Sequence, residues 1–206
     1  APTPTLPLFG NLHFDWPMKN ATITSEFGYR TDVKLGTDRG GADASLHFGL
    51  DLIPTDVTTA QAKRTQILAA EDGEAYIVYP PPGTPIPGSR KKFPGHASFG
   101  GCVMLRHVVG VYYGKTIYAY TLYGHMKEVW ISEHDSRGNP TRVKKGQPIG
   151  LMGSTGQSTG PHLHFEILFD PVNFFVLTSA ADQAKLDALQ AKADADYLVW
   201  RKNKGY

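Results

Sequence analysis

The segment 160–167 constrains the fold of this chain most strongly, because its polar and apolar residues alternate without interruption. Three polar residues share one side of the segment: His162, His164 and Glu166. Three apolar residues share the other side: Leu163, Phe165 and Ile167. A period of two residues predicts a β-strand whose apolar face packs on a core, with successive polar side chains about 7 Å apart on the opposite face. At that spacing one imidazole can bind a metal while its neighbour remains free to act on whatever the metal holds.

Length and composition are typical of one loop-rich globular domain. The chain has 206 residues, 41% of them hydrophobic, with 22 glycines and 15 prolines, and is too apolar to be disordered. The 21 Lys and Arg residues nearly balance the 19 Asp and Glu residues, so the net charge of +2 does not indicate binding to nucleic acid. The single cysteine, Cys102, cannot form an internal disulfide bond, and its apolar neighbours predict a buried thiol.

The sequence contains no signal for membrane insertion. No apolar run approaches the length of about 18 residues that a membrane-spanning helix requires. The first residues lack the basic start and the apolar stretch of a signal peptide. We therefore expect no membrane span, and we expect the chain to be a mature form or a part of a longer protein.

Composition divides the chain into three parts. Residues 1–21 contain four prolines and scattered aromatic residues, which predicts an extended N-terminal arm. Residues 22–178 contain the strand-like segments and form the predicted main domain. Residues 179–206 include a stretch from 180 to 200 without Gly or Pro, with apolar residues near helical spacing. They predict a C-terminal α-helix that packs on the domain or extends from it into a longer protein.

We predict a mainly β fold, an antiparallel β-sheet domain with long loops. Strand patterns occur at 22–30, 46–52, 66–70, 74–79, 102–107, 116–122 and 129–131, and on both sides of a turn within 143–150. Polar or proline-rich loops separate them at 31–45, 80–101 and 132–142. The segment 80–101 contains six prolines and five glycines, and loops of that length are often functional.

The histidines outside the alternating segment are the candidates for further metal ligands. His47 stands four residues before Asp51, and imidazole and carboxylate are both good zinc ligands. Four residues of a straight strand span about 13 Å, which is too far for both side chains to reach one ion. The chain must therefore bend between them, and Gly49 permits a kink. On spacing alone this pair is a weak signal.

The remaining five histidines have less context. His125 follows an apolar strand and, taken alone, is typical of a surface residue. His107 ends another predicted strand, and we assign it a structural role. The other three lie in loops without a partner in the sequence and receive no function: His13, His96 and His134.

Several short motifs follow one another in a fixed order. They are Thr24–Arg30, the His-x-x-x-Asp segment His47–Asp51, Tyr123–Met126, the turn Gly146–Gly150, the run Gly153–Gly156, and Pro161–Phe165. In this order they resemble the lysostaphin-type (LytM-like) zinc peptidoglycan endopeptidases. The resemblance extends from about Thr24 to Ile167, roughly two thirds of the chain.

This resemblance implies one Zn²⁺ per chain, bound by His47, Asp51 and His164 in a groove formed by the long loops. It also implies that His125 and His162 are the catalytic pair. Three protein ligands leave one position open for water, as a catalytic zinc site requires. The chain has no His-Glu-x-x-His motif to supply a glutamate base, so a histidine must take the proton of the water. We favour His162 as the base, because it is two residues from a ligand.

Further residues are candidates for the surroundings of the metal. Glu166 shares the face of the two histidines and either orients a metal-bound imidazole or, equally well, faces solvent or pairs with an arginine. Several relatives place a tyrosine in the loop before the His-x-x-x-Asp motif, whereas residues 31–46 contain none. That role is therefore empty, or it falls to Tyr29 or Tyr123.

Two other features concern the substrate. The glycine-rich run 153–160 lacks the lysine of a phosphate-binding loop and predicts a tight turn that lets the substrate backbone approach the metal. Arg30 is the candidate for binding a terminal carboxylate, should the enzyme remove single residues. The long loops 80–101 and 132–142 wall the groove, so the cleaved bond is not carried over from the glycyl-glycine enzymes.

The predicted function is a zinc-dependent endopeptidase that hydrolyses peptide cross-links of bacterial peptidoglycan. Its partners are peptidoglycan peptide stems or cross-bridges. The alternatives are a catalytically inactive peptidoglycan-binding or amidase-activating module, and a zinc carboxypeptidase acting on muropeptides. Such substrates place the chain in the extracellular space, the periplasm or the cell wall, or in a phage virion tail as part of a larger protein.

Overall fold

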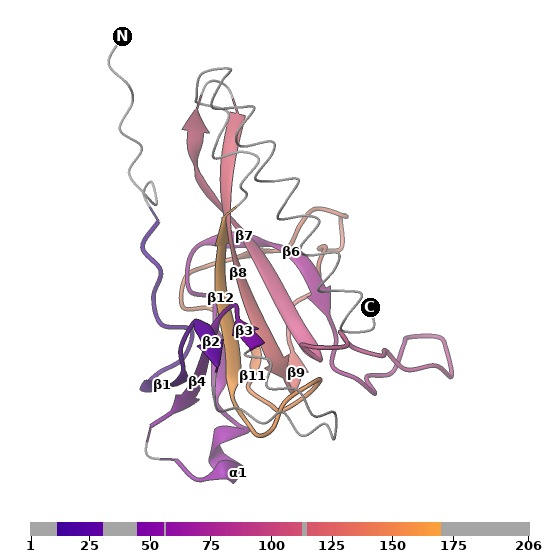
Figure 1. Ribbon diagram of the computed structural model, residues 1–206. Coiled ribbons are helices and arrows are strands. Elements are labelled where there is room, and N and C mark those ends of the chain that lie inside the picture. The colour runs from indigo at the N-terminus through magenta and orange to yellow at the C-terminus, as the bar shows by residue number, and fades with distance from the viewer. Residues whose placement is uncertain (1–11, 31–44, 56, 113–114, 170–206) are drawn as a thin grey trace. The chain divides into compact units, whose positions relative to one another are not determined.

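The structure is a computed structural model, which describes the residues drawn as a coloured ribbon in Figure 1: 12–30, 45–55, 57–112 and 115–169. They belong to two compact units. The larger unit, Leu12–His107 with Tyr120–Leu168, holds the candidate site. The described residues of the smaller unit are 108–112, 115–119 and Phe169. Among the described residues, no helix is long and apolar enough to cross a membrane.

A seven-stranded sheet is the largest element of the fold. Its strands, in spatial order, are β1 (Ala21–Ser25), β4 (Leu50–Pro54), β12 (Leu163–Phe169), β8 (Lys115–Met126), β7 (Gly101–Tyr112), β6 (Gly73–Tyr79) and β10 (Arg142–Val143). Strand β4 is antiparallel to β1 and to β12, and β6 is antiparallel to β7 and to β10. The predicted mainly antiparallel β fold is confirmed, and the last strand, β12, lies between β4 and β8 (Figure 1).

Two smaller sheets and one short helix complete the described part. The three-stranded sheet has the order β5 (Gln66–Leu68), β11 (Pro148–Leu151) and β9 (Glu128–Val129). The two-stranded sheet pairs β2 (Gly28–Arg30) with β3 (Ser45–His47), and α1 spans Thr59–Ala62. The turn predicted between 66–70 and 74–79 therefore connects two different sheets.

The hydrophobic core joins residues of the two larger sheets. Leu52, Leu105 and Leu163 come from the seven-stranded sheet, and Ile67 and Ile149 come from the three-stranded sheet; all five are 0% exposed. Removing this apolar surface from water is the main favourable contribution to folding. It also holds β12, whose other face carries the candidate site, in a fixed position.

The alternating segment forms a strand as predicted, with one exception on its apolar side. Leu163 and Phe165 are buried, at 0% and 5% exposure, whereas Ile167 is 40% exposed. The described pairing of β12 with β4 covers Leu163–Phe165, and Ile167 lies beyond it. Placing Ile167 in the core was therefore wrong. The polar side of the strand is not open to solvent either, because His164 and Glu166 are only 6% and 7% exposed.

The predicted proline-rich loop and the buried cysteine agree with the structure, whereas the predicted loop 31–45 lies almost entirely outside the described residues. Residues 80–100 contain no strand, only turns and the isolated bridges Pro85–Lys92 and His96–Gly100. Cys102 lies on β7 at 3% exposure, and burial raises the pKa of its thiol to about 12. Residues 12–20 form no regular element and bury Met18 in the core. The rest of the predicted arm and the predicted C-terminal helix lie outside the described residues.

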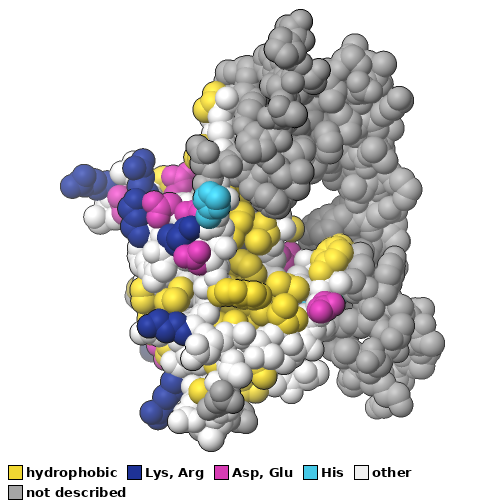
Figure 2. All heavy atoms as spheres, turned by 90° about the vertical axis from the view of Figure 1, so that its left-hand side faces the viewer, with side chains coloured by type: hydrophobic (Ala, Val, Ile, Leu, Met, Phe, Trp, Pro, Cys, Tyr) yellow, Lys and Arg dark blue, Asp and Glu magenta, His cyan; other side chains and the backbone are white. Residues whose placement is uncertain are grey.

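Several large hydrophobic side chains remain outside the core. Trp16, Ile23 and Phe27 are 57%, 41% and 63% exposed, along the N-terminal segment and around β1. Figure 2 shows hydrophobic side chains gathered on the side of the molecule that carries β1. These residues extend the apolar surface and add no ligand atom to the candidate site.

Candidate metal centre and active site

The fold brings together residues that are more than one hundred positions apart in the sequence. Asp51 on β4 and His164 on β12 are direct cross-strand partners in the antiparallel register. His47 ends β3, and the chain leaves the two-stranded sheet at Phe48–Gly49 before it enters β4. This interruption is the bend that the spacing of His47 and Asp51 requires.

The three candidate ligand atoms form a nearly equilateral triangle. His47 Nε2 lies 3.0 Å from His164 Nδ1, and both nitrogens lie 3.1 Å from Asp51 Oδ1. Ligands about 2.0–2.1 Å from a tetrahedral zinc ion are separated by about 3.3 Å. The two nitrogens and the oxygen are therefore arranged for one such ion. Among the described residues, this is the one group of three that could hold a metal.

The outer nitrogens of the two rings determine which nitrogens face the triangle. His47 Nδ1 lies 2.9 Å from the carbonyl oxygen of Glu26, which can only accept, so the ring donates from Nδ1. His164 Nε2 lies 2.7 Å from Glu166 Oε1, and the carboxylate accepts in the same way. In the neutral rings, His47 Nε2 and His164 Nδ1 thus present lone pairs to each other and to a carboxylate oxygen. Such an arrangement is unfavourable unless a cation or a proton occupies the centre.

The pKa shifts of Asp51 and His164 follow from this crowding. Burial by itself raises the pKa of Asp51, but the hydrogen bonds that its carboxylate accepts when a proton lies on the inner nitrogen of His164 or His47, together with the charge of nearby imidazoles, lower it far below its usual value. Burial by itself lowers the pKa of His164, but its bonds to Asp51 and Glu166 outweigh burial and raise it. The carboxylate of Asp51 therefore stays ionised, and the site attracts positive charge.

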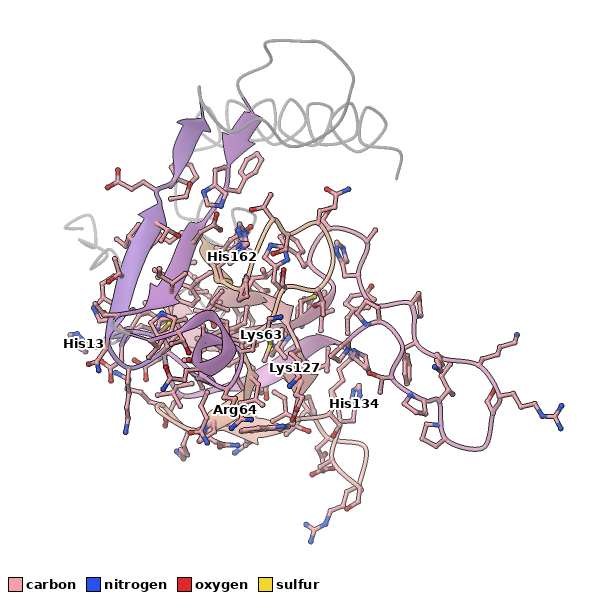
Figure 3. All side chains as sticks on the ribbon, turned by 90° about the horizontal axis from the view of Figure 1, so that it is seen from below. His13, Lys63, Arg64, Lys127, His134 and His162 are labelled. Atoms are coloured by element: carbon pink, nitrogen blue, oxygen red, sulfur yellow. The ribbon has the colours of Figure 1, made fainter. Side chains whose placement is uncertain are left out.

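His125 and His162 lie beside the triangle with their rings 4.6 Å apart. His125 Nδ1 is 2.8 Å from the carbonyl oxygen of Thr155, and His162 Nδ1 is 2.8 Å from that of Gly160. Each ring therefore donates from Nδ1, which leaves Nε2 as the acceptor in the neutral form. His162 Nε2 lies 3.5 Å from Asp51 Oδ1. Figure 3 shows His162 well separated from His13 and His134, two of the three loop histidines that received no function.

The backbone and the surroundings of His125 are unusual. Its φ of 62° lies in the left-handed region, which residues other than glycine rarely adopt and which is often found at functional sites. Burial, together with the charge of His162, lowers the pKa of His125 to about 4, so the ring is neutral near pH 7. Thr155 fixes this region, because its Oγ1 donates to Met126 O and accepts from Gly101 N.

The glycine-rich run contacts the proline-rich loop and not an open groove. Gly156 has a φ of 73°, and a Cβ there would lie 2.4 Å from Gly100 N. Gln157 N donates to Ser98 O at 2.8 Å. The prediction that the turn leaves room for substrate backbone is therefore wrong at Gly156, where the backbone of residues 98–100 fills the space. Gly160 alone among the glycines of this run has open space around it.

Sequence reasoning missed Phe99 and His96. The Phe99 ring stacks on His164 at 5.2 Å and on His96 at 5.0 Å, and its carbonyl accepts from His125 N at 2.7 Å. His96 Nδ1 accepts from Phe99 N and holds the loop in this shape. An aromatic residue within a proline-rich loop has no periodic signal, so only its position after folding reveals the contact.

Tyr123 does not lie in the site. It is 0% exposed, its Oη accepts from Ala70 N at 2.8 Å, and it lies 3.0 Å from Thr121 Oγ1. Its proposed role in the groove was therefore wrong. The predicted structural role of His107 is confirmed, because it is also 0% exposed and bonds Thr121 Oγ1 and the Asp72 carbonyl.

Two further candidates are only partly described. Tyr29 and Arg30 lie on β2, which pairs with the strand that carries His47. Their side chains lie outside the described part of the structure, and their roles remain predictions. Glu166 points at His164, so the alternatives of solvent exposure and of pairing with an arginine are wrong.

Three candidate ligand atoms with two further imidazoles beside them, on an antiparallel sheet, form the arrangement of a metal-dependent hydrolase. The chain belongs to peptidase family M23, whose model matches residues 46–174. The resemblance stated from the motifs is thereby confirmed at the level of the family.

Individual relatives agree with this assignment. The chain is 33% identical to the DD-carboxypeptidase/endopeptidase Mpg of Neisseria meningitidis serogroup B over 187 residues, 87% of this chain and 34% of that protein. It therefore spans about a third of that relative. It is 40% identical over 63 residues to the peptidoglycan DD-endopeptidase ShyC of Vibrio cholerae, 31% of this chain and 14% of that one.

A solved structure supports the fold. The crystal structure of a zinc-containing peptidase from Vibrio cholerae matches with a TM-score of 0.50 and 24% identity. The match covers 76% of this chain and 36% of that one.

Proposed function

We propose that this chain is a zinc-dependent peptidase that hydrolyses peptide cross-links of bacterial peptidoglycan. The observation that carries the proposal is the triangle of two imidazole lone pairs and one carboxylate oxygen, 3.0–3.1 Å apart, in a chain of peptidase family M23. The names of the Neisseria and Vibrio relatives support a bond of the DD type. The domain that performs the reaction is residues 22–178, flanked by the arm 1–21 and the helix 179–206.

In this proposal His47, Asp51 and His164 bind one Zn²⁺ per chain. Imidazole and carboxylate are ligands that zinc prefers, and the separations of 3.0–3.1 Å between the three ligand atoms fit a tetrahedral ion. When bound, zinc polarises the scissile carbonyl and lowers the pKa of a water molecule. The outer partners of the two rings, Glu26 O and Glu166, hold the proton of each neutral ring on its outer nitrogen, so the inner nitrogen has a lone pair for the metal.

His125 and His162 supply the proton transfers. Because each ring donates from Nδ1 to a backbone carbonyl, each can accept a proton at Nε2 and then donate it from the same atom. We infer that the two rings together carry one extra proton, which is taken from water and later given to the leaving amine. While a ring carries this proton at Nε2, it also donates a hydrogen bond to the developing oxyanion. We keep His162 as the first acceptor, because its Nε2 lies 3.5 Å from the ligand oxygen of Asp51.

Of the two alternative functions, the inactive module is less well supported than the carboxypeptidase. An inactive peptidoglycan-binding or amidase-activating module does not require two imidazoles beside a metal site. A zinc carboxypeptidase acting on muropeptides is favoured by the name of the Neisseria relative, which includes both activities. An assay must therefore distinguish cross-link cleavage from the loss of one terminal residue.

The substrate sets the location that we propose. Peptidoglycan lies outside the cytoplasmic membrane, so we expect the chain to act in the periplasm, in the cell wall or as a secreted bacteriolytic protein. A phage tail protein that opens the wall at infection is the other source of such a domain. Its partners in each case are peptide stems or cross-bridges.

The test uses the zinc-loaded chain with purified peptidoglycans that differ in their cross-bridges, and product identification by mass spectrometry. We expect cross-linked muropeptides to be converted to their uncross-linked halves. The reaction stops when a chelator is added and resumes when zinc is restored. His164→Ala abolishes both zinc binding and cleavage, whereas His162→Ala and His125→Ala abolish cleavage and retain one equivalent of zinc. The exposed His134→Ala is the matched control and keeps full activity.

Three results contradict the proposal in distinguishable ways. Loss of a single terminal residue alone identifies a carboxypeptidase. Zinc binding without any released peptide identifies a binding module. A wild-type chain that binds no zinc removes the proposed metal centre altogether.

A further inference from the structure

The buried pair His164–Glu166 has a role that neither the family nor the relatives' names assign. The two residues are separated by one position on β12, so both side chains lie on the same face of the strand. His164 Nε2 and Glu166 Oε1 are 2.7 Å apart, and each of the two side chains is 8% exposed. A carboxylate buried to this degree is rare unless it has a specific partner.

We infer that Glu166 is a positioning residue that fixes the tautomer and the orientation of His164 for metal binding; this inference rests on the proposed function. By accepting from Nε2–H, Glu166 leaves Nδ1 of His164 as the nitrogen that faces Asp51 and His47. A ring rotated by half a turn would place the Cδ2–H group in the triangle, and the other tautomer would place the Nδ1–H group there; either change removes one ligand atom. His47 is held in the same manner by a backbone carbonyl, that of Glu26. Each imidazole ligand thus has its own outer acceptor.

Gly49 makes this pair possible. A Cβ on Gly49 would lie 2.6 Å from Phe165 O, 2.8 Å from Glu166 Cγ and 2.9 Å from His164 Nε2. The backbone of Gly49 therefore lies directly against the hydrogen bond and leaves no room for a side chain. The same glycine stands at the interruption between β3 and β4 that brings His47 to Asp51. The position of Gly49 therefore accounts for the bend between β3 and β4 and for the close packing of its backbone against the Glu166–His164 hydrogen bond.

The inference predicts that changes at Glu166 and Gly49 act on zinc affinity. Loss of an outer acceptor of a metal-bound histidine typically weakens metal binding by about 10- to 100-fold. We expect Glu166→Ala to fall in that range. Glu166→Gln is isosteric and retains a carbonyl oxygen that can accept from Nε2–H, so it should lose less. Gly49→Ala should weaken zinc binding although it changes no polar group.

The experiment measures zinc affinity by competition with a chromophoric chelator, for the wild type and for these three variants. The Co²⁺-substituted proteins provide a spectrum that reports the ligand geometry. Glu74→Gln is the matched control, because it makes the same chemical change on the same sheet, in a carboxylate that pairs with Arg106. It should keep the affinity and the cobalt spectrum of the wild type. Thermal unfolding of the metal-free proteins records any loss of folding.

Each outcome decides the inference. The positioning role is supported if zinc affinity is lowest in Glu166→Ala, intermediate in Glu166→Gln and highest in the wild type, and if the cobalt spectrum is altered. Wild-type zinc affinity in Glu166→Ala, with only a lower melting temperature, overturns it and leaves a structural role, while the zinc site of the proposed function stands. If Glu166→Ala does not fold, Glu166→Gln and Gly49→Ala decide, and wild-type affinity and spectrum in both overturn the inference. A wild-type chain without zinc binding overturns the inference and the proposed function together.

Discussion

Replacing Tyr123 by phenylalanine separates a core residue from a catalytic one. The Tyr123 hydroxyl accepts from the buried Ala70 N–H at 2.8 Å and lies 3.0 Å from Thr121 Oγ1. Burial raises the pKa of this phenol to about 12, so it remains protonated at neutral pH. Phenylalanine fills nearly the same volume but leaves the Ala70 N–H without its acceptor. A buried polar group that loses its partner costs about 1–3 kcal/mol.

This cost converts into a measurable change in melting temperature. For a protein of this size, about 1 kcal/mol corresponds to roughly 2–4 °C, so Tyr123→Phe should lower the melting temperature by roughly 2–12 °C. Urea unfolding should show a lower midpoint with an unchanged slope. Cleavage of cross-linked muropeptides, measured below the melting temperature, should remain within about twofold of the wild type. Tyr76→Phe is the control, because Tyr76 is 45% exposed and should change stability by less than about 0.5 kcal/mol.

The opposite pattern would refute the reasoning. An unchanged melting temperature together with a loss of activity of about tenfold or more would mean that the Tyr123 hydroxyl acts on the substrate, since about 1.4 kcal/mol of transition-state stabilisation corresponds to tenfold in rate. It would also mean that the hydrogen bond to Ala70 N contributes nothing to folding.

Two other predictions concern a buried imidazole and the aromatic ring next to the site. Burial lowers the pKa of His107, so below about pH 6.5 the unfolded chain binds a proton that the folded chain does not. His107 therefore does not affect the free energy of unfolding above that pH, and it destabilises the fold increasingly as the pH falls below it. The urea midpoint of His107→Gln should consequently decline less between about pH 7 and pH 5 than that of the wild type. Equal declines in the two proteins would contradict this prediction. Phe99→Leu should weaken zinc binding by about 2- to 10-fold, because a stacked aromatic contact contributes about 0.5–1.5 kcal/mol, here to the position of His164. The exposed Phe27→Leu should leave zinc affinity unchanged, and equal affinities in both variants would mean that the Phe99 ring does not hold His164.

The case of Tyr123 also shows where a strand pattern fails. Tyr123 and His125 are two residues apart on β8, so a regular strand would place both on one face. The left-handed backbone at His125, with φ 62°, breaks the alternation. Tyr123 consequently faces the core and His125 faces the metal site. Histidine is enriched among non-glycine residues with a positive φ, but such residues are too uncommon for the local sequence to signal this change.

The sequence by itself determined the features that depend on neighbouring residues. The alternation at 160–167 predicted strand β12, and the prolines and glycines of 80–101 predicted a loop, because side-chain period and backbone restriction are local properties. The spacing of His47 and Asp51 required a bend, and the chain is interrupted at Phe48–Gly49. The order of the motifs was enough to name the family.

Only the tertiary structure decided how these residues meet. The register that pairs His164 with Asp51 joins strands more than one hundred residues apart, and it depends on which strands are neighbours in the sheet. The same packing places Phe99 on His164 and sets Gly49 against the Glu166–His164 bond. The sequence did not contain this information, so it could not decide the role of Glu166. The tautomers of the ligand rings follow from acceptors such as Glu26 O, whose positions exist only after the sheets have packed. A metal site requires that its ligand atoms lie about 3 Å from one another. When the ligands come from remote segments of the chain, the fold determines these distances.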